Sequence, residues 1–118
     1  MKFIVSSNEI SSNFKTISRV INSKNALPIL DCFLFELQDG TLSATVSDSE
    51  TTMVTTVEVN ESDMDGRFAV TAKTLLDALK EIPEQPLTFE INTYSLEITV
   101  QYQNGKYSLM GQNADEFP

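Results

Sequence analysis

Histidine and tryptophan are absent from this chain of 118 residues, and cysteine occurs once, at position 32. The missing histidine removes the usual general base and the commonest metal ligand, so His-dependent catalytic triads and zinc sites are excluded. A single cysteine also excludes an intramolecular disulfide. Cys32 lies within the apolar run 29–35, which favours a buried core thiol in a reducing compartment over a catalytic thiol.

Long apolar runs are lacking as well. The N-terminal apolar stretch turns polar at Ser6, which is too short for a signal peptide or a membrane span, so a cytoplasmic protein without a membrane partner is expected. Hydrophobic residues make up 41% and charged residues 21% of the chain, the balance of a globular protein. The length suits a single domain over 1–118.

The first part of the chain predicts a strand followed by a helix. Residues 2–5 form a short apolar run, and Ser6 with Glu9 three positions later forms a capping box. Apolar residues then recur at helical spacing from Ile10 and predict a helix that ends near Asn22. Three strands are predicted after it, over 29–37, 41–47 and about 51–59, with an Asp39-Gly40 turn between the first two.

The same order of elements then begins again. After an acidic loop over 60–66, the run 67–70 predicts a strand and Thr71 an N-cap. The second helix has Leu75, Leu76, Leu79 and Ile82 on its apolar side and ends at Pro83. Three more strands are predicted over 86–92, 95–102 and 106–110, the last two joined at Asn104-Gly105. This pattern predicts an α+β fold of two β-α-β-β-β units about a pseudo-two-fold axis, with two helices side by side on antiparallel sheets.

The charges are unevenly distributed. A net charge of −9 argues, taken alone, against a nucleic-acid partner, because phosphate binding needs lysine and arginine. Five of the eight cations nevertheless fall in the predicted helices or directly after them: Lys15, Arg19, Lys24, Lys73 and Lys80. Over 8–24 and 71–80 these five meet two acids, a net charge of +3, whereas the remainder has three cations and 15 acids, a net charge of −12. The acidic total therefore conceals one basic surface, with two ordinary solvated helix faces as the alternative.

Acidic side chains cluster at Asp48 with Glu50 and over 58–65. The pair is interpreted as a charged turn between strands in preference to a general acid and base. The stretch from Asp63 to Gly66 does not meet the ligand spacing of a calcium loop. A Gly-rich phosphate loop and a nucleophile elbow are both absent from the sequence. We therefore predict no metal site, no cofactor and no catalytic residue.

Six segments together resemble one known family. They are Met1-Lys2-Phe3, Leu27-Pro28-Ile29-Leu30, Asp39-Gly40-Thr41-Leu42, Ser47-Asp48-Ser49-Glu50, Val70-Thr71-Ala72-Lys73-Thr74-Leu75-Leu76-Asp77 and Asp115-Glu116-Phe117-Pro118. In this order and spacing they are similar to the N-terminal domain of the bacterial DNA polymerase III β subunit, the replicative sliding clamp. The resemblance covers the whole chain.

The resemblance implies a fold, a function and a set of partners. Subunits of that family contain three such domains, and two subunits close head to tail into a ring around duplex DNA. It therefore implies the DNA-clamp fold, with the helices lining the hole, and a non-catalytic processivity factor of the DNA polymerase III holoenzyme that binds DNA independently of sequence. The family's cleft for polymerase and clamp-loader peptides lies between the second and third domains, so these partners are expected to bind outside this chain.

The resemblance also implies two sets of site residues. Lys24 stands just before Leu27-Pro28, where the family often has an arginine that touches DNA, and the helical cations are expected to face phosphates. The last predicted strand has a free edge, which in the family faces the neighbouring subunit. Tyr107 and Leu109 would anchor that contact and Lys106 would offer a cation. The alternative is that Tyr107 and Leu109 are ordinary core residues.

A second function of a different class stays open at this point. A small α+β enzyme or ligand-binding domain would have a pocket between its helices and sheet. A convergent polar pocket with perturbed carboxylates favours that function, whereas two adjacent helices without a deep pocket favour the clamp domain.

Overall fold

The computed structural model describes residues 1–19, 31–47 and 51–117. Within these ranges the strands and helices follow one another in an order that repeats the same pattern. They are β1 (Lys2–Ser6), α1 (Ser7–Ser18), β2 (Cys32–Gln38), β3 (Thr41–Ser47), β4 (Thr52–Glu58), β5 (Gly66–Thr71), α2 (Ala72–Leu79), β6 (Pro86–Ile91), β7 (Glu97–Tyr102), β8 (Gly105–Met110) and the 3₁₀ helix η2 (Ala114–Glu116). No helix in the described ranges is long and apolar enough to cross a membrane.

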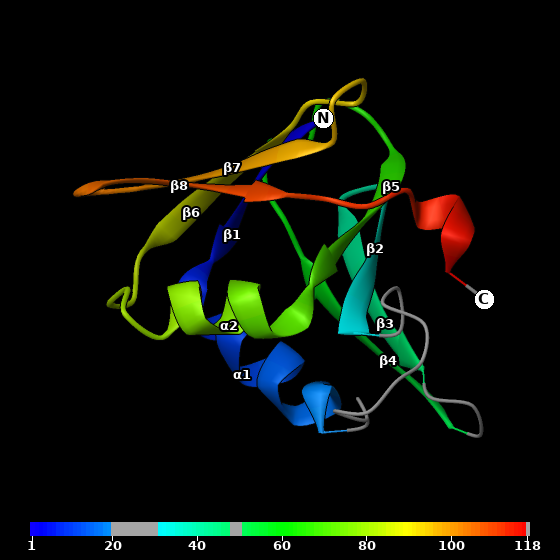
Figure 1. Ribbon diagram of the computed structural model, residues 1–118. Coiled ribbons are helices and arrows are strands. Elements are labelled where there is room, and N and C mark those ends of the chain that lie inside the picture. Colours follow the sequence, from blue (N-terminus) through cyan, green and yellow to red (C-terminus); the bar gives the residue numbers. More distant parts are fainter. Residues whose placement is uncertain (20–30, 48–50, 118) are drawn as a thin grey trace.

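The strands form two four-stranded antiparallel sheets, with the orders β1-β6-β7-β8 and β4-β3-β2-β5. Each sheet combines three consecutive strands of one repeat with the first strand of the other repeat. The predicted α+β fold is confirmed, and its two units are interlocked because each gives its first strand to the sheet of the other. The helices lie side by side along one side of the pair of sheets (Figure 1).

The repeat is visible in matched aromatic pairs. Phe3 stacks on Phe89 with ring centroids 5.1 Å apart, across the β1–β6 pairing. Phe68 packs on Phe35 at 4.9 Å, across the β5–β2 pairing. Phe3 and Phe68 therefore occupy equivalent places in strands that are 65 positions apart. The same offset relates Ser6 and Thr71, the N-caps of the two helices.

Two equivalent backbone bridges also link the sheets. Ile4 and Asn60 exchange two hydrogen bonds of 2.8 Å, which join β1 to the segment after β4. Ala69 and Gln112 exchange bonds of 3.2 and 2.8 Å, which join β5 to the segment after β8. Within the described residues, all of β1, β4, β5 and β8 are edge strands, and β4 and β8 are the two whose free edge has no such bridge.

The core lies between the inner faces of the sheets and the apolar sides of the helices. Its largest side chains are six fully buried phenylalanines: Phe3, Phe14, Phe33, Phe35, Phe68 and Phe89. Burying one such ring contributes about 1.5–3 kcal/mol, so this cluster is a main source of stability. Cys32 is also fully buried, as predicted.

Ser6 and Thr71 stand at the two N-cap positions as predicted, but both helices are shorter than predicted. The Ser6 hydroxyl accepts a hydrogen bond of 3.5 Å from the Glu9 N–H, whereas the Thr71 side chain forms no capping hydrogen bond. Helix α1 ends at Ser18 and not near Asn22, and α2 ends at Leu79 and not at Pro83, so both predicted ends are wrong. The Ser18 hydroxyl donates to the Lys15 carbonyl at 2.7 Å, and such local side-chain bonds compete with the helical pattern. Residues 20–30, including Asn22, lie outside the described residues.

The other strand boundaries agree with the predictions to within a few residues where the structure describes them. β7 begins at Glu97 and not at position 95. The Asn92 side chain explains the difference, because its Oδ1 accepts from the N–H groups of Tyr94 and Ser95 at 2.9 and 3.0 Å. This Asx turn, followed by Leu96 at φ 66°, occupies residues that the apolar pattern alone assigns to the strand.

Candidate nucleic-acid interface

Helix α1 turns two cations away from the core. Its apolar face buries Ile10, Phe14 and Ile17, which are spaced at four and three residues. At about 100° per residue, Lys15 and the C-cap residue Arg19 fall on the opposite side, and both are exposed. The two cations therefore lie on and directly after a helix whose other side packs on the core.

Helix α2 does the same with two lysines. Its buried residues are Ala72, Leu75 and Leu79. Lys73 in the first turn and Lys80 at the C-cap are exposed. The Lys80 backbone N–H donates to the carbonyl of Leu76 at 3.0 Å, which holds the Lys80 backbone at the helix end.

The two helices contact each other and lie side by side (Figure 1). Because each helix turns its cations away from the core, we infer that these cations lie on one side of the molecule. We call Lys15, Arg19, Lys73 and Lys80 the basic helix face. No ion pair in the described part of the chain engages Lys15, Arg19 or Lys73, whereas the Lys80 Nζ lies 3.6 Å from Asp77 Oδ1. Lys24 lies outside the described residues. This face offers charge to an anionic surface without a fixed pattern of base-reading groups.

A hollow of about 510 Å³ lies beside the helices. Its lining comes from both of them and from the residue before β2: Ser18, Asp31, Thr71, Ala72, Lys73, Leu76 and Asp77. A second hollow, of about 420 Å³, includes Lys2, Asp63, Glu90 and Glu97 and lies by the other face of the sheet β1-β6-β7-β8. Over the described ranges, no group of three histidine, cysteine or acidic side chains could hold a metal ion.

The acidic stretch before β5 has a structural use. Asp63 Oδ1 accepts from the Lys2 N–H at 2.8 Å, and Asp65 Oδ1 accepts from the Asp39 N–H at 3.1 Å. These bonds tie the loop to β1 and to the β2–β3 turn. The other predicted acidic pair, Asp48 and Glu50, lies outside the described residues.

Strand β8 is an edge strand, and its side chains alternate as the sequence predicts. Tyr107 and Leu109 are half-buried on the side of the core, while Lys106 and Met110 are exposed on the other side. The Tyr107 ring stacks on Tyr102 with centroids 5.4 Å apart. Tyr107 and Leu109 thus lie at the margin of the core, where each is partly packed and partly open to a partner.

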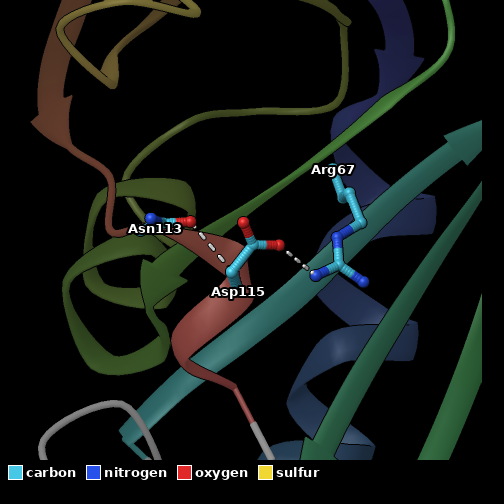
Figure 2. A network of polar contacts seen from close by, with 3 residues as sticks. All are labelled: Arg67, Asn113 and Asp115. Atoms are coloured by element: carbon cyan, nitrogen blue, oxygen red, sulfur yellow. Dashed lines mark hydrogen bonds and ion pairs between the residues drawn. The ribbon is translucent and has the colours of Figure 1, made fainter.

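The segment after β8 is tied to β5 by polar contacts. The Arg67 guanidinium donates to Asp115 Oδ1 at 2.7 Å, and the Asp115 N–H donates to Asn113 Oδ1 at 3.0 Å (Figure 2). Arg67, one of the cations outside the helices, therefore holds η2 in place. Just beyond η2, Phe117 packs against the buried Cys32 and Ala69.

Two features of these surfaces are not among the sequence predictions. One is the ion pair of Asp77 with Lys80, for which the spacing of three residues on a helix is a signal in the sequence. The other is Met110, which is 64% exposed on the edge strand. Its exposure follows from the side-chain alternation of β8, so the sequence contains the signal for it.

Comparison with known proteins gives one consistent result. Residues 1–118 match the family described as DNA polymerase III beta subunit, N-terminal domain. The beta sliding clamp of Buchnera aphidicola subsp. Acyrthosiphon pisum (strain APS) is 28% identical over 119 residues, a match that covers the whole chain and 32% of that protein. The chain therefore spans about a third of the length of this relative and of the beta sliding clamp of Buchnera aphidicola subsp. Rhopalosiphum padi.

Solved structures agree in fold. The DNA polymerase sliding clamp from Caulobacter crescentus matches with a TM-score of 0.91 and 18% identity, over the whole chain and 32% of that protein. The Helicobacter pylori beta clamp bound to a DNA ligase peptide matches with a TM-score of 0.90 and 22% identity, also over the whole chain and 32% of that protein. Because the family match extends over all 118 residues, the chain belongs to the DNA polymerase III β subunit family and corresponds to the N-terminal domain of that subunit.

Proposed function

We propose that this chain is one domain of a sliding clamp, a ring that encircles duplex DNA and keeps a polymerase on its template. The basic helix face would line the hole, and the two sheets would form the outer rim. The domain itself would catalyse no reaction and would work in the cytoplasm. Its affinity for DNA would be electrostatic and independent of sequence.

The observation that carries this proposal is the position of the cations. In a chain of net charge −9, four cations lie on the exposed sides of two adjacent helices. The remaining described cations, Lys2, Arg67 and Lys106, lie on strands. Phosphates are attracted to concentrated positive charge, while the acidic remainder of the surface repels them. DNA is therefore expected to approach the helices.

A ring that moves along DNA must attract the duplex without holding it at one sequence. Lysine and arginine side chains reach phosphates, which carry no sequence information, so a face of this kind positions the duplex without selecting a site. Besides Lys15, α1 exposes Asn8, Ser12 and Thr16, which neither repel phosphate nor form an apolar patch, and a single acid, Glu9, in its first turn. The face is therefore suited to a protein that moves along DNA.

The subunit contact is proposed at β8. Tyr107 and Leu109 would pack against apolar side chains of the neighbouring subunit's third domain, and Lys106 would face acids there. The half-burial of both apolar residues on an edge strand supports this role. Polymerase and clamp loader would bind through domains outside this chain, as would peptides of the kind bound in the Helicobacter pylori relative.

Charge reversal tests the proposed DNA face. In this chain, the double variant Lys15→Glu/Arg19→Glu should lose most of the weak binding to duplex DNA measured by fluorescence anisotropy at low salt. The wild-type affinity should fall with salt by about 0.9 in log K per log salt for each phosphate contacted. Lys2→Glu, which reverses a cation on β1, is the control and should bind like the wild type once its charge change is allowed for.

Two results would contradict the proposal. One is a double variant that binds as tightly as Lys2→Glu, which would move the DNA contact away from the helices. The other is submicromolar, sequence-selective binding at physiological salt, which would indicate base readout in place of phosphate contact.

A further inference from the structure

Helix α2 carries one carboxylate between the two lysines of the basic helix face. Lys73, Asp77 and Lys80 are spaced at four and three residues, which places them along one side of the helix. The Asp77 Oδ1 lies 3.6 Å from the Lys80 Nζ, with side-chain exposures of 54% and 68%. Asp77 and Lys73 also line the hollow of about 510 Å³ beside α1.

Helix α1 lacks this carboxylate at the equivalent place. The offset of 65 positions that relates the two N-caps also relates Ser12 to Asp77 and Lys15 to Lys80. Ser12 is exposed and uncharged, so Lys15 has no acid three residues before it. Lys15 and Lys80 therefore occupy equivalent positions in the two repeats, but only Lys80 has a carboxylate, that of Asp77, three residues before it.

Helix stability does not account for Asp77. The residue lies in the last turn of α2, where the negative end of the helix dipole disfavours a carboxylate. An exposed pair with a spacing of three residues contributes little to folding. The effect of Asp77 is therefore expected mainly on the charge that Lys80 and Lys73 offer to a ligand.

We propose that Asp77 weakens the hold of the basic helix face on DNA by competing with phosphate for Lys80. This inference rests on the proposed function of that face. An exposed ion pair is easily broken, so phosphate displaces Asp77 at a modest cost and the contact forms and breaks readily. The face then retains enough attraction to guide the duplex without holding it at one position.

Two variants test the proposal in opposite directions: one neutralises the carboxylate of α2, and the other adds a carboxylate at the equivalent position of α1. Asp77→Asn should bind a mixed-sequence duplex about two- to fivefold more tightly at low salt, the factor equivalent to one exposed ion pair. Its plot of log K against log salt should become steeper by up to about 0.9, since Lys80 gains a phosphate. Ser12→Asp, which places an acid three residues before Lys15, should weaken binding by a similar factor.

Glu97→Gln is the charge-matched control, because Glu97 is exposed on β7 next to the buried Ile98 and so lies on the outer face of the sheet. Asp77→Asn binding no tighter than Glu97→Gln would overturn the role of Asp77. Lys73→Gln separates this failure from a failure of the proposed function. If Lys73→Gln weakens binding while Asp77→Asn equals the control, only the role of Asp77 is wrong; if Lys73→Gln has no effect, the DNA face itself is wrong. Circular dichroism of each variant confirms that the fold is kept.

Discussion

Cys32 is held in the core by residues that are distant in the sequence. Its side chain is fully buried, next to Ala69 of β5 and under Phe117 of the C-terminal segment. Burial raises the pKa of the Cys32 thiol above its usual value, and a hydrogen bond with Thr71 acts in the opposite direction. Because the thiolate is the reactive form, native Cys32 should react slowly with thiol reagents.

Removing the covering ring should make this thiol reactive. We expect Phe117→Ala to increase the rate of Cys32 labelling by Ellman's reagent at least about tenfold at pH 8, because water and reagent then reach the sulfur. The rate should rise further with pH as the thiol ionises. Tyr94→Ala, at a residue that is 97% exposed, is the control and should label at the wild-type rate. Equal rates in Phe117→Ala and wild type would show that Phe117 does not protect the core.

Single residues also show which parts of the site can be read from a sequence. The outward direction of Lys15, Arg19, Lys73 and Lys80 follows from helical spacing against an apolar stripe, which is local information. The contact of Arg67 with Asp115 spans 48 positions and depends on how β5 meets the segment after β8. No spacing rule predicts such a pair, because the fold brings the two side chains together.

The helices and strands begin where local signals are strong. Ser6 and Thr71 stand at the starts of α1 and α2, and the Ser6 side chain also accepts a capping hydrogen bond, which is a local arrangement. The end of α1 has no such signal, and the periodic pattern continues past Ser18. The start of β7 is set by the Asn92 side chain, whose hydrogen bonds outweigh the strand tendency of the residues after it.

Strand β8 carries the element-scale prediction about assembly. In the proposed three-domain subunit, Leu109→Asp should convert the proposed ring dimer into monomers, measured by sedimentation velocity. The reason is that Leu109 is half-buried, so an aspartate there would bury an unpaired carboxylate in the proposed subunit contact, which disfavours association. Met110→Asp adds the same charge on the exposed side of the same strand and should leave the dimer intact.

The fold of the variant separates the two interpretations of Leu109. Circular dichroism of this chain with Leu109→Asp should show the wild-type spectrum and a lowered but cooperative melting transition. An unfolded chain would favour the role of Leu109 as an ordinary core residue. A dimer that stays as tight as the wild type would remove β8 from the proposed subunit contact.

At the scale of the whole molecule, the exchange of strands between repeats could not be predicted from the repeat pattern. The sequence predicts strand, helix and three strands twice, but two separate units and two interlocked units have the same order of elements. The pairing of Phe3 with Phe89 joins residues 86 positions apart, and that of Phe35 with Phe68 joins 33. Such strand pairings form because they bury the apolar faces of both sheets in one core, and the packing of that core depends on the whole chain.

The distribution of charge is also a property of the whole molecule. The acids that outnumber the cations lie largely on strands, loops and turns, while the two adjacent helices carry four of the described cations. Because the two helices lie together on one side of the two sheets, the cations that the sequence concentrates in the helical segments form one basic side of the molecule. The proposed clamp function depends on this separation more than on any single lysine.

A nuclear magnetic resonance titration of this chain with a short duplex locates the DNA-binding surface. At about 0.01 M salt, where the screening length is about 30 Å, we expect amide shifts concentrated in α1 and α2, strongest around Lys15, Arg19, Lys73 and Lys80. The shifts should be the same for two unrelated duplex sequences and should vanish at high salt. Shifts centred on the outer face of the sheet β1-β6-β7-β8, or shifts that persist at high salt for one sequence, would rule out a basic helix face that binds DNA independently of sequence.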